Sequence, residues 1–282
     1  MSGAEKRRQL REEYKRKLLD ALPTYHIPPI PDELVEEILR TGLIILGGGG
    51  TGKSTIAKLL AAHFINKQDG NVQVKIIDKV YNWVLDFEPI YYQDVDSETE
   101  IGDFYWGEDH ILYNAHFKDP DEMKALASDL VGIDYDLHFL YKRAGIMDNW
   151  VVWFTEEAHN ILGRYGISGK IGKYWLTYIT EGRNLNLSFV FIGRRAADIS
   201  TSVIENAQGY LFTKATGDRD KTKIKGICGK EAEVHLMVPK LRMPPEACEA
   251  IYWNGVEAKK LVVSEYDSNG MVPILWKGRN DI

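Results

Sequence analysis

The chain of 282 residues is 44% hydrophobic, carries a formal net charge of −6 and contains two cysteines, Cys228 and Cys248. Its size allows one large core with a modest appendage, and two cysteines supply neither a disulfide framework nor a metal-ligand cluster. The acidic balance argues against a uniformly basic nucleic-acid-binding protein, and the lack of an apolar run of about 18 residues predicts no integral membrane segment, so we expect a cytoplasmic protein.

The N-terminal region differs from the rest in its charge and proline content. Residues 6–17 are rich in lysine and arginine, and a proline-rich stretch over residues 23–31 then interrupts helical structure. We therefore expect a basic helical arm and linker over residues 1–36 and a single main domain over residues 37–282. A short helix over residues 32–40 is expected to lead into the first strand.

A glycine-rich loop follows the apolar run Leu43–Leu46 and fits the pattern G-x-x-x-x-G-K-[ST]. Glycines allow successive backbone N–H groups to point at a phosphate, Lys53 reaches the β and γ oxygens, and Ser54 offers its hydroxyl to Mg²⁺. Apolar residues at helical spacing come next, which completes the order of strand, loop and helix. The sequence thus predicts binding of a nucleoside triphosphate. The expected nucleotide-binding residues are Gly47, Gly50, Thr51, Gly52, Lys53, Ser54 and Thr55.

A second strand is predicted over residues 72–78 and ends at Asp78. From residue 81 to residue 117, aromatic residues alternate with carboxylates, and neither a helical nor a strand period persists. We expect this stretch to be an insertion packed on the core. Residues 119–144 then show the spacing of a long helix.

The next strand, Val151–Thr155, is continuously apolar, which is typical of a strand buried on both faces of a parallel sheet. It is followed directly by Glu156 and Glu157. Phosphoryl transfer needs an acid that holds Mg²⁺ and a group that orients the attacking water, and this pair can supply both. Such a pair also occurs where a helix simply begins, because carboxylates complement the helix dipole. The phosphate loop favours the catalytic interpretation, and a water-activating acid favours hydrolysis over a small-molecule kinase.

The remaining elements complete an alternating pattern. A helix is predicted over residues 173–181, strands over 187–192 and 209–212, and a hairpin from 261–264 and 272–275. We therefore predict an α/β fold: a P-loop NTPase with a doubly wound, mainly parallel sheet covered by helices on both faces, plus a small C-terminal β-hairpin. Ligands of such sheets bind at the carboxyl ends of the strands. Asp78, Glu156, Glu157 and Arg194 should therefore surround the phosphate loop.

Three segments also carry a family resemblance. Phe154–Asn160 resembles the D-E-A-H element of the HerA and FtsK superfamily of DNA-pumping ATPases, Thr180–Ser188 resembles its E-G-R-x-x-G-[LV] segment, and Phe189–Ser200 resembles its strand followed by S-Q-R-P-x-[DE]-[IV]-S. The resemblance implies ATP and Mg²⁺ as cofactors, with Ser54 and Glu156 at the metal. It also implies roles for Glu157 as the catalytic acid, Asp78 as the acid after the second strand, and Arg183 as an arginine supplied to the neighbouring subunit's site.

The chain departs from the family pattern at three positions. Glu156 stands where the family usually has Asp, Arg194 stands where it usually has a glutamine that senses the γ-phosphate, and Ala196 replaces a proline. An arginine accepts no hydrogen bond, so Arg194 cannot orient a water as glutamine does, although it can contact the γ-phosphate as a cation.

The resemblance points to an oligomeric, hexameric ATPase that moves double-stranded DNA through a central channel. About forty residues before the phosphate loop leave no room for the β-barrel of HerA-type repair proteins, so the outline is similar to viral genome-packaging ATPases. Candidate partners are duplex DNA, gripped by the basic run over residues 214–230, further copies of the chain, and a capsid or membrane-protein vertex. For a viral protein, the location is the host cytoplasm and the virion. The alternative is an assembly, secretion or plasmid-mobilisation ATPase that docks on a protein partner without packaging DNA.

Overall fold

The computed structural model describes residues 32–66, 71–79, 83, 90–96, 98–100, 103–104, 110–115, 119–146, 149–163, 170–214, 217–229, 248–263 and 274–277. In this part of the chain the strands form one ten-stranded sheet in the order β10-β9-β8-β7-β1-β6-β5-β2-β4-β3. Neighbouring strands from β7 to β3 are parallel, whereas β8, β9 and β10 add an antiparallel extension beside β7.

The strands are β1 (Leu43–Gly47), β2 (Val72–Asp78), β3 (Ile90–Val95), β4 (His110–Ala115), β5 (Trp150–Thr155), β6 (Leu187–Gly193), β7 (Gly209–Lys214), β8 (Cys248–Trp253), β9 (Ala258–Val263) and β10 (Ile274–Lys277). The α-helices are α2 (Asp32–Thr41), α3 (Lys53–Asn66), α4 (Pro120–Ala144), α5 (His159–Leu162), α6 (Lys170–Glu181), α7 (Thr201–Asn206) and α8 (Asp218–Cys228). Two 3₁₀ turns, η2 (Gly182–Leu185) and η3 (Ala196–Asp198), flank β6.

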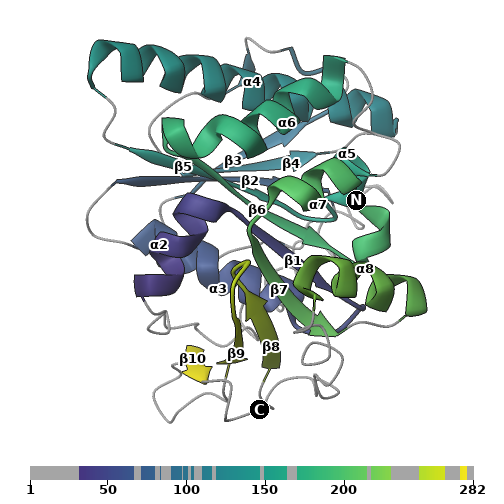
Figure 1. The fold of residues 1–282 in the computed structure, drawn as a ribbon. Helices are drawn as coiled ribbons and strands as arrows, with labels where there is room; N and C mark the ends of the chain where they lie inside the picture. The colour runs from purple at the N-terminus through teal and green to yellow at the C-terminus, as the bar shows by residue number, and fades with distance from the viewer. Residues whose placement is uncertain are drawn as a thin grey trace, which may run out of the picture.

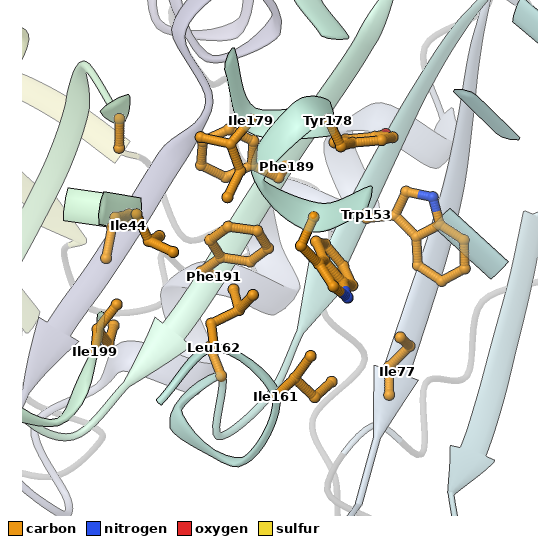
Figure 2. Close-up of a cluster of buried hydrophobic side chains, with 14 of the residues drawn as sticks. Ile44, Ile77, Trp153, Ile161, Leu162, Tyr178, Ile179, Phe189, Phe191 and Ile199 are labelled. Carbon is orange, nitrogen blue, oxygen red and sulfur yellow. The ribbon is translucent and has the colours of Figure 1, made fainter. Parts of the chain in front are cut away.

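Helices cover both faces of the parallel part of the sheet. Figure 1 shows α2 and α3 below the sheet and α4 and α6 above it. The alternation of side chains along a strand explains this arrangement, because successive residues point to opposite faces. In β1, Leu43 and Ile45 pack with the residues of α2 and α3, whereas Ile44 and Leu46 join the cluster beneath α4 and α6. The second cluster is shown in Figure 2, where Trp153, Phe189 and Phe191 lie among aliphatic side chains.

The longest helix, α4, begins and ends at residues that suit those positions. Asp119 accepts a hydrogen bond from the backbone N–H of Asp121, Pro120 occupies the first turn, and Gly145 ends the helix with φ 71°. On its buried side, Asp134 reaches into the sheet: Lys75 Nζ lies 2.6 Å from one carboxylate oxygen, and Trp153 donates to the other at 2.7 Å. The helix is therefore fixed to β2 and β5, two strands whose carboxyl ends carry predicted site residues.

The predicted fold class is confirmed, and so are the helix at residues 32–40, the long helix after Asp119 and the pairing of β9 with β10. One prediction needs correction: the region 81–117 contains β3 and β4, which extend the parallel sheet beyond β2. Strand β3 was not predicted because it lies at the sheet edge, where Tyr91 is exposed and polar residues interrupt the apolar pattern. The hairpin partner β8 was also missed.

The boundary predicted between the N-terminal arm and the main domain falls inside helix α2. Helix α2 crosses the position between residues 36 and 37, and its Leu34 and Val35 are buried in the same core as β1. We therefore propose that the main domain includes the whole of α2, from Asp32 onward. The basic arm lies outside the described residues.

Candidate active site

The phosphate loop joins the end of β1 to the start of α3, as the sequence predicted. Gly50 and Gly52 have φ values of 68° and 84°, a region that residues with a Cβ rarely adopt. Lys53 is the first residue of α3, and its Nζ donates to the carbonyl oxygen of Gly48 at 2.7 Å. The ammonium group therefore lies over the loop that would cradle a phosphate. Burial lowers the pKa of Lys53, while the nearby carboxylates of Glu156 and Glu157 oppose that shift.

Thr51 ties the loop to the neighbouring strand β7. Its hydroxyl donates to Gly48 O at 2.8 Å and lies 2.6 Å from the hydroxyl of Thr213, at the carboxyl end of β7. Both threonines are buried. These contacts fix the loop from the side of β7, whereas the acidic residues approach it from β5 and β2.

Glu156 is the carboxylate that contacts the loop directly. The Ser54 hydroxyl donates to its Oε1 at 2.8 Å, and the indole N–H of Trp83 donates to its Oε2 at 3.1 Å. A backbone hydrogen bond of 3.1 Å from Glu156 N to Ile77 O holds the end of β5 against β2. The Glu156 side chain is buried, and this desolvation raises its pKa, although the hydrogen bonds from Ser54 and Trp83 favour the ionised form.

Asp78, at the end of β2, is also buried and lies beside this group. Its Oδ2 accepts the backbone N–H of Trp83 at 2.8 Å. The sequence predicted Asp78 as a nucleotide-binding residue, and the structure places it near Glu156, with which it shares Trp83 as a partner. Its observed hydrogen bond fixes the position of Trp83.

Glu157 has a different set of partners from the residue before it. Its backbone is left-handed, with φ 49°, and its Oε1 accepts from Arg194 Nε at 2.7 Å. His159 Nδ1 lies 3.2 Å from the other oxygen, Oε2, yet neither atom has a hydrogen-bond partner of good geometry among the described residues. A buried carboxylate oxygen without a donor is suited to accept a proton or a hydrogen bond from a water.

The side-chain oxygens at the loop can bind Mg²⁺ when nucleotide phosphates supply further ligands. Ser54 Oγ and Glu156 Oε1 are hard donors that lie 2.8 Å apart. Within the described residues, no group of three or more His, Cys, Asp or Glu side chains is arranged to hold a metal ion. Mg²⁺ is typically bound by one or two protein oxygens plus substrate phosphates and waters, so the residues fit a nucleotide-borne Mg²⁺.

Arg183 lies away from this group. It is exposed in η2, directly before β6, whereas the phosphate loop and Arg194 lie at the other end of the parallel strands. Arg195, the residue after Arg194, pairs with the buried carboxylate of Asp220 at 3.1 Å. The structure thus brings together every predicted site residue at one edge of the sheet except Arg183.

Three residues at this edge were missed by sequence reasoning as members of the site: Trp83, Thr213 and His159. Thr213 could have been found, because it directly follows the strand predicted over residues 209–212, and ligands bind at the carboxyl ends of such strands. His159 lies within the segment that resembles D-E-A-H. Trp83 had no signal beyond belonging to an aromatic stretch.

The sheet order and the phosphate loop define the class of fold, that of the P-loop NTPases. No protein-family model matches the chain, and a search of curated protein sequences finds no match. Solved structures do match. The genome packaging NTPase B204 from Sulfolobus turreted icosahedral virus 2, in complex with AMPPCP, has a TM-score of 0.57 at 13% identity, covering 79% of this chain and 97% of that chain.

Two bacterial proteins give similar agreement. VirB4 of Thermoanaerobacter pseudethanolicus has a TM-score of 0.54 at 10% identity and covers 85% of this chain and 90% of its own. EssC (ATPases 2 and 3) from Geobacillus thermodenitrificans has a TM-score of 0.51 at 10% identity, with 85% and 40% coverage. At these identities the comparison shows a shared fold, which agrees with the resemblance found in the motifs.

None of the described helices has the length and apolar character needed to cross a membrane.

Proposed function

We propose that this chain is an ATP-hydrolysing, ring-forming motor that moves double-stranded DNA, and that its task is to package a viral genome into a capsid. The observation that carries the proposal is the meeting of Lys53, Ser54, Glu156 and Glu157 around one phosphate loop. The likeness to the packaging NTPase B204 over 97% of that chain supports the finer part of the proposal.

Each residue at the loop has a role that follows from its position. Lys53 leaves the Gly48 carbonyl for the β and γ oxygens of ATP, and the loop N–H groups together with the N-terminus of α3 bind the phosphates. Ser54 and Glu156 would hold Mg²⁺, which supplies charge neutralisation on the phosphates when bound. Glu157 uses its Oε2 to orient the attacking water and accept its proton.

Arg194 is held by Glu157 and is 65% exposed, so it is free to turn toward a bound nucleotide. We assign it as the cation that contacts the γ-phosphate in place of the glutamine of the related motif. Its departure would also free Oε1 of Glu157. Arg183 cannot serve the same loop, because it precedes the strand that Arg194 follows. Its exposed position supports a role at the site of the next subunit in a ring, where it would neutralise charge on the γ-phosphate.

Turnover of ATP, measured with and without duplex DNA, tests the proposed motor. We expect stimulation by DNA, and Lys53→Ala should lower the rate by about a hundred-fold or more because it removes a charge from the transition state. Lys124→Ala is the matched control, since that lysine pairs with the exposed carboxylate of Asp121, three residues earlier in the chain. Turnover by Lys53→Ala equal to that of the wild type would refute the assigned site.

Subunit mixing tests the role of Arg183. Arg183→Ala should bind ATP without hydrolysing it, and in mixed rings it should lower the activity by more than dilution explains. Arg40→Ala, an exposed arginine on α2, is the control. A simple linear loss of activity on mixing would contradict action on the neighbouring subunit. Electron microscopy with ATP should show a ring, expected to be hexameric, with a channel of duplex width.

Helix α8 is the candidate DNA contact in the basic run. Arg219 and Lys225 are exposed on it, and lysines or arginines that neutralise phosphates make DNA binding depend on salt. Replacing both by alanine should reduce the slope of log affinity against log salt concentration by about 2. An unchanged slope would place the DNA contact elsewhere.

The second candidate function is an ATPase that acts on a protein partner in secretion, assembly or plasmid mobilisation. The similarity of the fold to VirB4 and EssC favours it. ATP turnover that is indifferent to duplex DNA, in a protein whose Lys53→Ala variant is inactive, would favour this candidate over packaging.

A further inference from the structure

Trp83 contacts the site, although it belongs neither to the phosphate loop nor to the pair Glu156 and Glu157. It is 1% exposed, and its ring packs edge to face against Phe154 with centroids 5.6 Å apart. Its two N–H groups are both used on acids: the backbone N–H donates to Asp78 at 2.8 Å, and the indole N–H donates to Glu156 at 3.1 Å. One tryptophan thus joins the carboxylates at the ends of β2 and β5.

The hydrogen bond from Trp83 restricts the orientation of the Glu156 carboxylate. Ser54 donates to Oε1, and Trp83 donates to Oε2, so each oxygen of the carboxylate has its own donor. Glutamate has one more rotatable bond than aspartate, and an additional donor removes that freedom. With Oε2 fixed by the indole, Oε1 stays directed at the Ser54 hydroxyl, the other oxygen that suits Mg²⁺.

We propose that Trp83 is a positioning residue for the metal-binding carboxylate: it orients Glu156, and Asp78 in turn orients Trp83. This inference rests on the proposed nucleotide and Mg²⁺ site. It also gives Asp78 a definite task through its bond to the Trp83 backbone. Partners that orient a metal ligand are worth roughly ten-fold or more in metal affinity when removed.

Binding of a non-hydrolysable ATP analogue, measured by calorimetry with and without Mg²⁺, tests this role separately from catalysis. In Trp83→Phe, the aromatic packing against Phe154 is kept and the indole donor is lost. We expect the Mg²⁺-dependent gain in affinity to fall by about ten-fold, while the affinity measured without Mg²⁺ stays within about two-fold of the wild type.

Trp153→Phe is the matched control. It also deletes an indole N–H that donates to a buried carboxylate, that of Asp134, but on the opposite face of the sheet. Its stability should fall as in Trp83→Phe, and its Mg²⁺-dependent gain should be unchanged. The proposal would be overturned if Trp83→Phe kept the full Mg²⁺-dependent gain in nucleotide affinity, or if both variants lost this gain equally.

A second variant, Glu156→Asp, tests the same link from the side of the carboxylate. In Glu156→Asp the shorter carboxylate cannot reach both donors, so the Mg²⁺-dependent gain in affinity should fall. Adding Trp83→Phe to this variant should then change the gain by less than about two-fold, because the effects of residues in contact are not additive. Equal effects of Trp83→Phe on both backgrounds would refute the coupling. Failure of DNA to stimulate turnover would count against the motor and leave these binding results intact, whereas a wild type with no Mg²⁺-dependent gain would overturn both.

Discussion

Removal of the charge on Asp134 should weaken the fold far more than removal of a surface charge. The Lys75 ammonium lies 2.6 Å from the Asp134 carboxylate, and the two side chains are 4% and 3% exposed. Asp134→Asn keeps the shape and a carbonyl acceptor for Trp153, but the buried cation loses the opposite charge that faces it. Breaking a buried pair from one side costs about 3–5 kcal/mol. For a domain of this size, that loss lowers Tm by about 10 °C.

Urea unfolding followed by circular dichroism, together with calorimetry, measures this loss. Glu36→Gln is the matched control, because the Arg40–Glu36 pair has side chains 74% and 64% exposed and should contribute less than about 1 kcal/mol. The double variant Lys75→Met/Asp134→Asn should recover most of the stability, since it removes both buried charges while Trp153 keeps an acceptor. A loss below about 1 kcal/mol in Asp134→Asn would refute the reasoning about burial.

Three further predictions follow from other parts of the structure. Gly42→Ala should lower the free energy of unfolding by about 2 kcal/mol or more, because φ is +66° and a Cβ would overlap the Phe189 ring, whereas Gly226→Ala, which meets open space, should not destabilise the protein. Burial raises the pKa of Cys228 to about 12, so a thiol reagent at pH 8 should modify it only after unfolding, and stability should decline as pH rises above the unfolded pKa of about 8.5. Peptide mapping separates Cys228 from Cys248, and rapid labelling of Cys228 in the native protein would contradict this prediction. Arg194→Ala should reduce kcat by about ten-fold with little change in ATP affinity, as steady-state kinetics and calorimetry would show, and an unchanged kcat would remove its assigned role.

Much of the nucleotide site was predictable because its signals are local. The glycines of the loop, the apolar run of β5 and the acids that follow it are neighbours in the chain, so their order alone indicates strand, loop and helix. The rule that parallel strands end at one edge then places Asp78, Glu156 and Arg194 near Lys53. The hydrogen bonds from Ser54 to Glu156 and from Arg194 to Glu157 agree with that expectation.

Tertiary structure decided what depends on contacts between distant segments. Strand order puts β7 beside β1, and only that neighbour brings Thr213 to Thr51. Edge position explains why β3 has no continuous apolar pattern, since a strand exposed at one side need not be apolar throughout. The two adjacent glutamates have different partners because Glu157 has a left-handed backbone and because the donors come from different elements. Trp83 is the clearest case: nothing in its local sequence distinguishes it from other buried aromatics, and its role follows from a hydrogen bond across 73 positions.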